Sequence, residues 1–283
     1  MEWLVGWLGL PRLLLLAVVF VPLERLLALH DRPVVRRELS TDLAWAVMGG
    51  ALVRLGFALA MLGAFALREL LGPTALAARI AAQPLWLQCI EVMVVSDFCF
   101  YWVHRMFHAV PALWRFHAVH HSIEEMDWLA GHRVHPLDQA LTKGSAYLPV
   151  ILLGFSDWAV AAAAFLYGWH TVLLHANVRL KLRFLEGVIA TPAFHHWHHG
   201  RERKAWDRNF AAQFSLFDRL FGTAYLPKGE APTLYGVEEP VPRSFLGQLA
   251  YPFRRSPASP AAVAQPVQAP RKASSSSPIT STA

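Results

Sequence analysis

Charged residues are scarce in this chain, and that scarcity excludes the commonest class of protein. Only 16% of the 283 residues are Asp, Glu, Lys or Arg, whereas 55% are hydrophobic and the mean hydropathy is +0.33. Soluble domains usually carry about a quarter charged residues. The composition therefore indicates an integral membrane protein. The net charge of +6 is interpreted as an excess of Lys and Arg on cytoplasmic faces, and no nucleic-acid partner is expected.

Cysteine is also scarce, and several catalytic motifs are missing. The two cysteines, Cys89 and Cys99, lie in one apolar segment, so no disulfide framework is indicated. The sequence contains no HExxH, GxSxG or GxGxxG motif, which excludes the usual signatures of zincins, α/β-hydrolases and dinucleotide-binding folds. The Glu-x-x-His pairs of carboxylate-rich di-iron bundles are missing as well.

Long apolar runs are what the sequence has in place of charge. Three of them, 8–29, 43–67 and 85–103, approach or exceed the roughly 20 residues that a membrane-spanning helix needs. A fourth apolar region, 146–174, is interrupted near its middle by Pro149 and Gly154. This interruption predicts either a hairpin of two short helices or one long kinked helix.

The basic residues predict the orientation of these segments. Three arginines follow the first apolar run, and seven Lys or Arg residues lie between Arg179 and Arg208, after the fourth. The positive-inside rule places both stretches in the cytoplasm. We therefore expect an inner-membrane protein whose active site faces the cytoplasm, although Arg68 and Arg79 would then lie on the outer face.

The predicted fold is all-α. It is an integral membrane helical bundle with about four transmembrane helices or hairpin segments and a cytoplasmic histidine-rich helical cap. The expected divisions are N-terminal transmembrane helices over 1–84, a histidine-box di-metal catalytic domain over 85–226 and a C-terminal extension over 227–251. Pro, Ala and Ser dominate 252–283, which is predicted to be a disordered tail.

Histidine is concentrated in one part of the chain. Thirteen of the 14 histidines lie between His104 and His199. Most of them fall in three boxes, HRMFH at 104–108, HAVHH at 117–121 and HHWHH at 195–199. Within a box the histidines are three or four residues apart, a spacing that puts their side chains on one face of a helix. The boxes therefore predict metal ligands rather than scattered core histidines.

The number of imidazoles predicts more than one metal ion. The three boxes supply eight at these intervals, with His196 as an extra, and His135 or His175 could add more. A tetrahedral zinc site needs four ligands, so this set suits two ions with open coordination positions. Imidazole binds Zn, Cu, Fe and Ni alike, so the spacing alone does not choose the metal. Asp97, two turns before the first box, either orients a ligand's second N–H or caps a polar seam.

The boxes and their flanks together resemble the fatty acid hydroxylase/sterol desaturase superfamily. The first box is preceded by SDFCFYWV, and RVHPLD resembles the family's HP segment after the second box. LLHANVRL and TPAF lead into the third box, and NFAAQFSLFDRLFGT resembles the family's closing stretch. The resemblance covers about residues 94–226.

The resemblance implies a chemistry and a ligand set. Members of this superfamily are membrane-bound non-haem di-iron oxygenases that use O₂ and two electrons from an external donor to hydroxylate or desaturate a lipid C–H bond. The implied partners are a lipid from the bilayer and a separate ferredoxin- or cytochrome-type electron donor. No role follows for His132, His170 or His196. By position, the implied metal ligands are His104, His108, His117, His120, His121, His175, His195, His198 and His199, with His135 as a tenth.

Two other functions are compatible with the residues alone. A metal-dependent membrane hydrolase acting on a lipid would need a general base beside a metal-bound water, and Glu124, Glu125 and Asp127 follow the second box. A non-catalytic protein that handles metal or haem is the other, but the apolar runs have few polar residues to line a transport path.

Overall fold

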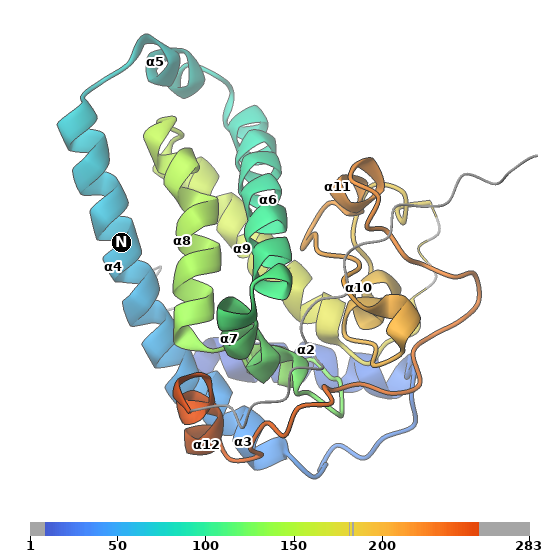
Figure 1. Ribbon diagram of the computed structural model, residues 1–283. Coiled ribbons are helices and arrows are strands. Elements are labelled where there is room, and N and C mark those ends of the chain that lie inside the picture. Colours follow the sequence, from blue (N-terminus) through green and yellow to red (C-terminus); the bar gives the residue numbers. More distant parts are fainter. Residues whose placement is uncertain (1–8, 181, 183, 255–283) are drawn as a thin grey trace, which may run out of the picture.

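The computed structural model describes residues 9–180, 182 and 184–254, and the regular elements of this part are helices joined by loops (Figure 1). Within it there is no β-strand, only two isolated bridges, which join Ala28 to Val178 and Gly200 to Tyr235. The all-α prediction is confirmed.

Two helices in the described part are long and apolar enough to cross a membrane. The first covers Leu39–Leu71 and the second is α6 (Leu85–Ala109), with 33 and 25 residues. They coincide with two of the predicted runs. The first is continuous through three elements, α3 (Leu39–Ala44), the π-helical turn η1 (Trp45–Gly49) and α4 (Gly50–Leu71).

The outer face of α4 is apolar and uncovered by protein. Leu55, Leu59 and Leu62 are 60%, 60% and 65% exposed. Water would make such a row unfavourable, whereas lipid tails would not. The composition and the two candidate spans together identify a membrane protein.

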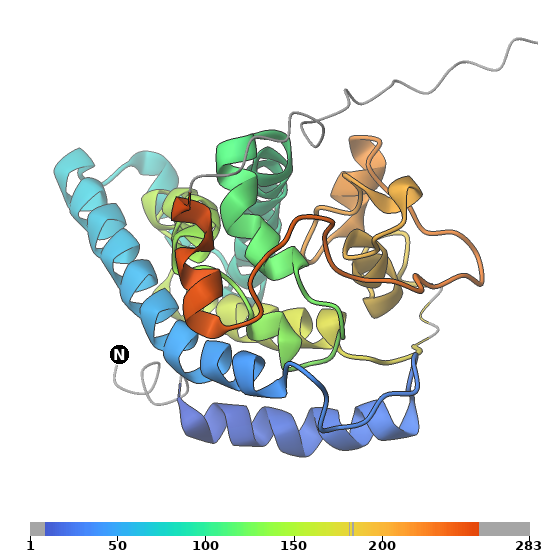
Figure 2. The same cartoon turned by 60° about the horizontal axis from the view of Figure 1, so that its bottom comes forward.

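The first predicted span has a different place in the fold. It forms α2 (Leu10–Leu26), which runs across the base of the bundle instead of alongside α4 and α6 (Figures 1 and 2). Its buried Leu16 and Phe20 pack in one cluster with Leu129 and Val172. Among the described residues α2 is not a candidate span, so the expected count of four membrane segments is not confirmed.

The fourth apolar region forms two separate helices, α8 (Pro136–Leu152) and α9 (Asp157–His175). Gly154 makes the break, with φ of 80°, and a Cβ there would lie 2.7 Å from the Cβ of Ala77. Both helices pack against α6, and α8 also packs against α4. The first helix begins ten residues earlier than the apolar run because its opening turns carry polar side chains.

The remaining elements connect the bundle or surround its base (Figure 2). The short α5 (Ala75–Ala81) joins the far ends of α4 and α6. Residues 252 and 253 belong to the last short helix, residue 254 follows it, and residues 255–283 of the predicted tail lie outside the described residues. The other elements are α7 (Pro111–His121), η2 (Ala130–His132), α10 (Pro192–His198), η3 (Arg203–Ala205), α11 (Ser215–Leu220), α12 (Phe245–Ala250) and η4 (Tyr251–Phe253).

A buried ionic cluster fixes the loop at η2 to the start of the first candidate span. The guanidinium of Arg133 is 1% exposed and contacts Asp42 at 2.7 Å and Glu38 at 2.8 Å. Arg36 contacts the same Asp42 at 2.6 Å and Asp127 at 2.6 Å. Buried charges are tolerated only when they are paired in this way.

Candidate metal centre

The three histidine boxes are brought together by helices from both halves of the chain. The first box ends α6, the second ends α7, and the third forms α10 with His199 as its C-cap residue. Thr191 begins α10, because its hydroxyl accepts the N–H of Phe194 and Pro192 follows at the first helical turn. His175 ends α9 and joins them from a fourth direction.

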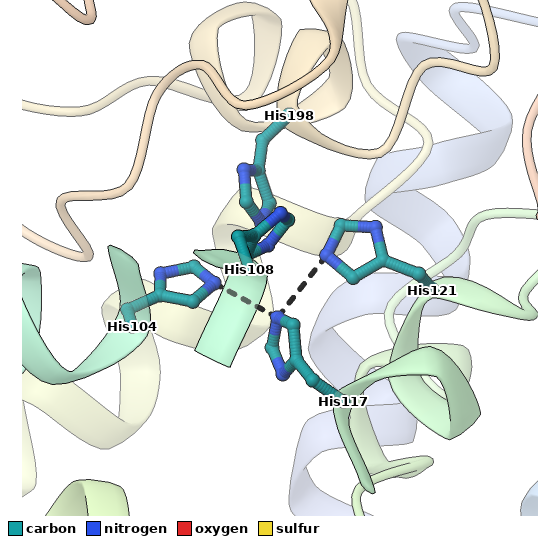
Figure 3. Close-up of side chains that lie close together, drawn as sticks. All are labelled: His104, His108, His117, His121 and His198. Carbon is teal, nitrogen blue, oxygen red and sulfur yellow. Dashed lines mark hydrogen bonds between the residues drawn. The ribbon is translucent and has the colours of Figure 1, made fainter. Parts of the chain in front are cut away.

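The side chains converge into two groups. In each group the candidate ligand atoms all lie within 4.8 Å of one another. The groups are adjacent, since the rings of His121 and His199 are 4.5 Å apart and stacked. The first group, drawn in Figure 3, consists of His104, His108, His117, His121 and His198. The second group consists of His120, His175, His195 and His199.

Neighbouring residues divide between the groups. His120 and His121 are consecutive in α7 but point into different groups, and so do His198 and His199 at the end of α10. Consecutive side chains on an α-helix are about 100° apart, so one helix end can reach two adjacent ions.

The hydrogen bonds of the first group leave lone pairs facing each other. His104 Nδ1–H donates to the carbonyl of Phe210 at 2.6 Å, and His117 Nδ1–H donates to Asp138 Oδ2 at 2.7 Å. In a neutral imidazole the other nitrogen then carries no proton. The two Nε2 atoms nevertheless lie 2.9 Å apart, and His121 Nε2 lies 3.1 Å from His117 Nε2 (Figure 3).

The second group repeats the pattern. His120 Nδ1–H donates to the carbonyl of Arg133 at 3.1 Å, and His175 Nδ1–H donates to the carbonyl of Thr171 at 2.7 Å. Their Nε2 atoms are 3.2 Å apart, and His195 Nε2 lies 3.0 Å from His175 Nε2. Two nitrogens bound at right angles about 2.1 Å from one ion would lie about 3.0 Å apart.

Other ring nitrogens in the groups are buried without any protein partner. They are Nε2 of His108, Nε2 of His198, Nδ1 of His195 and both nitrogens of His199. A buried polar atom left unpaired costs roughly 1–3 kcal/mol. Facing lone pairs and orphaned nitrogens are both satisfied by a cation between the rings, so the donor set fits two metal ions.

Burial favours the neutral form of several of these rings, the form that binds a cation. Burial, and then the nearness of other imidazoles, lowers the pKa of His117 and His121 well below the ordinary value. The same causes lower the pKa of His195, His198 and His199. A ligand imidazole must be unprotonated, and burial ensures that state at neutral pH.

Asp138, and not Asp97, is the carboxylate that orients a ligand. It lies in the first turn of α8 and accepts from His117. The carboxylate of Asp97 instead accepts three backbone N–H groups, from Ala212, Gln213 and Phe214 at 2.7–3.0 Å. Of the two roles predicted for Asp97, the structure has the cap. In the sequence, Asp138 could have been found as the carboxylate that closely follows His135 and Pro136.

The closing stretch of the domain holds the backbone that the ligands use. Asp218 accepts the N–H groups of Phe210 and Ala211 at 2.7 and 2.8 Å. The carbonyl of Phe210 orients His104, and the carbonyl of Arg208 accepts from His198 Nδ1 at 2.7 Å. The segment from Asn209 to Thr223, which follows the third box, therefore supports the same site through its backbone.

The structure does not bring His135 into either group. Its Nδ1 accepts the N–H of Leu137 at 3.2 Å, and its Nε2–H donates to the carbonyl of Leu249 at 3.2 Å. Both ring nitrogens are therefore engaged at the start of α8. His135 serves as the N-cap of α8, and the proposed ligand set does not include it.

The three histidines without a predicted role make hydrogen bonds outside the groups. His132 Nδ1 contacts the carbonyl of Leu129 at 3.2 Å, and His170 Nε2 contacts that of Ala190 at 2.9 Å. His196 donates from Nε2 to the carbonyl of Ala176 and accepts at Nδ1 from the Tyr235 hydroxyl, at 3.0 and 2.7 Å. His196 therefore ties α10 to the C-terminal extension.

Comparison with known proteins identifies the part of the chain that carries the centre. Residues 89–223 match the family profile described as fatty acid hydroxylase. These residues are a fatty acid hydroxylase domain. The resemblance to the fatty acid hydroxylase/sterol desaturase superfamily is thereby confirmed, and the domain contains all nine histidines of the two groups.

Curated relatives of the fatty acid hydroxylase domain act on lipids according to their names. The chain is 32% identical over 176 residues to the ornithine lipid hydroxylase OlsE of Rhizobium tropici, covering 61% of this chain and 52% of that protein. It is 33% identical over 146 residues to the alkylglycerol monooxygenase of Homo sapiens, covering 51% and 32%. It is 31% identical over 155 residues to the fatty acid hydroxylase vlmA of Lecanicillium, covering 46% and 40%.

These likenesses cover only part of each relative. The chain spans about half the length of the ornithine lipid hydroxylase and about a third of the alkylglycerol monooxygenase. No solved structure matches the chain.

Proposed function

We propose that the chain is a membrane-bound non-haem di-iron oxygenase that hydroxylates or desaturates a lipid C–H bond with O₂ and external electrons. The observation that carries the proposal is the pair of adjacent imidazole groups. In each group one pair of rings, His104 with His117 and His120 with His175, has its Nε2 atoms 2.9 or 3.2 Å apart although the Nδ1 hydrogen of each ring is donated elsewhere. The names of the relatives, lipid hydroxylase and alkylglycerol monooxygenase, support the choice of reaction.

The ligand set we propose is the nine histidines of the two groups, with two iron ions bound. Iron would supply the activation of O₂ that cleavage of an aliphatic C–H bond requires. The chain's own residues fix the rings by hydrogen bonds from Nδ1 to Asp138 and to backbone carbonyls. Their burial excludes bulk water from the centre.

The membrane arrangement supports a lipid substrate. The first box ends α6, a candidate span, so the centre lies beside a helix end at the edge of the apolar bundle. A lipid tail could reach the centre from the bilayer without crossing water. We propose further that the protein resides in the inner membrane with four membrane segments and its histidine-rich cap in the cytoplasm. The division into residues 1–84, 85–226, 227–251 and 252–283 is part of the same proposal.

The electron donor would approach from the cytoplasmic face. We expect a separate ferredoxin- or cytochrome-type protein. Arg179, Arg201 and Arg203 are exposed basic residues near the third box that would attract an acidic partner. Lys204 is exposed too, although it is paired with Glu230 at 2.9 Å.

The three acids that could serve as the general base of a hydrolase are engaged with arginines. The Glu124 carboxylate pairs with Arg37, Glu125 accepts the N–H of Arg37, and Asp127 pairs with Arg36. None of the three acids belongs to either histidine group. No observation favours hydrolysis over oxygenation.

Lipid profiling tests the proposal directly. Cells that make the intact protein are compared with cells that make a His195→Ala, His198→Ala variant, with and without oxygen. We expect a lipid heavier by one oxygen, or lighter by two hydrogens, only with the intact protein and oxygen. A product that forms equally well without O₂ would overturn the proposal in favour of hydrolysis.

A further inference from the structure

A lysine lies between the helices of the bundle, further along α8 than Asp138, the partner of His117. Lys143 is in the middle of α8 and is half-buried between helices. Its ammonium lies 5.8 Å from the centre of the Tyr167 ring of α9. Ionisable side chains among membrane helices are unfavourable and for that reason usually functional.

The position of Lys143 relative to the centre follows from a short chain of ring contacts. The Tyr167 ring lies 6.4 Å from the Phe100 ring of α6, and Phe100 lies 5.1 Å from His104, a member of the first group. Phe100 and Tyr167 are half-buried like Lys143. Partly exposed side chains in successive contact therefore connect Lys143 with His104.

A second cation approaches the same turn of α9. Arg12 of α2 donates to the carbonyl of Gly168, the neighbour of Tyr167, at 3.4 Å. A Cβ at Gly168 would lie 2.8 Å from Arg12 Nη2, so glycine allows this approach. Gly168 directly follows Tyr167, so Arg12 and Lys143 approach the same turn of α9.

Neither cation forms an ion pair within the part of the chain that the structure describes. Among the residues that the structure describes, no carboxylate oxygen lies within 4.0 Å of Lys143 or Arg12. Asp138 precedes Lys143 on α8, but its Oδ2 accepts from His117. An uncompensated cation in an apolar bundle is costly, and an anion bound beside it offsets that cost.

We propose that Lys143 and Arg12 bind an anionic oxygen group, a carboxylate or a phosphate, on the lipid substrate. The inference rests on the proposed function and specifies the substrate class: a lipid whose charged group is held at α9 while its chain passes Phe100 to the metal centre. The distance from charged group to ligands is fixed by the helices. The carbon that is oxidised should therefore lie a fixed number of carbons from the charged group.

Binding to the metal-free protein tests the site apart from turnover. In detergent, the quenching of tryptophan fluorescence is titrated with oleate, with dioleoylphosphatidic acid and with uncharged oleyl alcohol. We expect Lys143→Met to weaken binding of at least one anionic lipid by about tenfold or more, since charge-assisted hydrogen bonds contribute about 1.5–3 kcal/mol. Lys143→Arg should retain most of the affinity, and the alcohol should bind both variants equally. Arg12→Gln should weaken the same lipid.

A matched control and a folding check accompany the titration. Lys228 is an exposed lysine far along the chain, and Lys228→Met should leave every affinity unchanged. Lys143→Met should still bind two irons, which shows that the fold persists. Preference for oleate identifies a free fatty acid as the source of the anion, and preference for phosphatidic acid identifies a headgroup. Equal affinity of all three lipids, or equal weakening for the alcohol, would overturn the inference.

Turnover gives an independent readout. With anionic lipids of increasing chain length, the new hydroxyl or double bond should stay at a constant number of carbons from the charged group. A position that is constant from the methyl end instead would contradict the inference. Absence of any O₂-dependent product from any lipid would overturn the proposed function alone, because the binding result stands without turnover.

Discussion

His104 Nε2 and His117 Nε2 lie 2.9 Å apart although the Nδ1 hydrogen of each ring is donated elsewhere. Neutral imidazoles in this tautomer cannot hydrogen-bond to each other through those atoms. The contact is favourable only with a cation between them.

Removing the Asp138 charge should weaken the first metal position. Asp138→Asn keeps the shape but loses the carboxylate that orients His117, and such changes commonly cost about 10–100-fold in metal affinity. The measurement is iron retention during titration with a chelator. Asp157→Asn, at an exposed carboxylate in α9, is the control and should retain iron as the unaltered protein does.

Adjacent histidines should control different ions. His198→Ala removes a proposed ligand of the first group and His199→Ala one of the second. Each variant should therefore hold about one iron, whereas the unaltered protein should hold two. Elemental analysis of purified protein counts the ions. His135→Ala should still contain two irons. Loss of both ions from the His135 variant would show that His135 is a ligand after all.

Gly131 should be needed for the second metal position. A Cβ at Gly131 would lie 2.8 Å from Cγ of His175, so Gly131→Ala should displace that ring and reduce iron to about one per chain. Gly63, in α4, has nothing within 4 Å of its Cβ position. Gly63→Ala should keep both irons and raise stability by about 0.5–1 kcal/mol. A full iron complement in the Gly131 variant would refute the steric argument.

Arg133 should contribute far more to stability than an exposed arginine. Arg133→Met leaves Glu38 and Asp42 buried with fewer partners and should destabilise the fold by about 3–5 kcal/mol. Arg37→Met removes only an exposed pair with Glu124 and should change stability by about 0–1 kcal/mol. Thermal unfolding of both variants in one detergent makes the comparison. Equal shifts would mean that burial of the cluster has no energetic weight.

The metal-free protein should lose stability in mild acid. Burial lowers the pKa of His117, His121 and His199 in the folded state below the ordinary value of about 6.5, so the unfolded chain binds more protons as the pH falls. The contribution of neutral rings is complete above pH about 6.5 and is lost progressively below it. Melting temperatures measured from pH 8 to pH 5 should therefore fall. His199→Gln should flatten the decline, and a melting temperature that rises in acid would have the wrong sign.

The spacing of the histidines predicted which side chains converge better than it predicted how they divide into two groups. Three- and four-residue intervals place side chains on one helix face, so the boxes were visible in the sequence. The sequence did not show that His120 and His121 belong to different groups, because this depends on how α7 packs near α9 and α10. His135 shared the residue type and neighbourhood, but its nitrogens bond to the backbone at the start of α8.

Carboxylates were harder to assign, because an acid serves equally well as a cap or as the partner of a histidine. Asp97 lies on the face of the first box, yet its oxygens accept the N–H groups of residues 212–214 from the other half of the chain. Hydropathy likewise could not determine the position of α2 in the fold. Its composition suits a membrane, but its packing through Leu16 and Phe20 places it across the base of the bundle.

The division of neighbouring histidines has a consequence for the order of events during synthesis. Each group draws ligands from the segment that ends at His121 and from the segment between His175 and His199. Neither half of the chain alone contains a complete set for the second position, and the first lacks His198 until the end of α10. A ribosome must therefore complete α10 before either proposed ion could be fully enclosed, so we expect metal capture and docking of the two halves to occur as one late step.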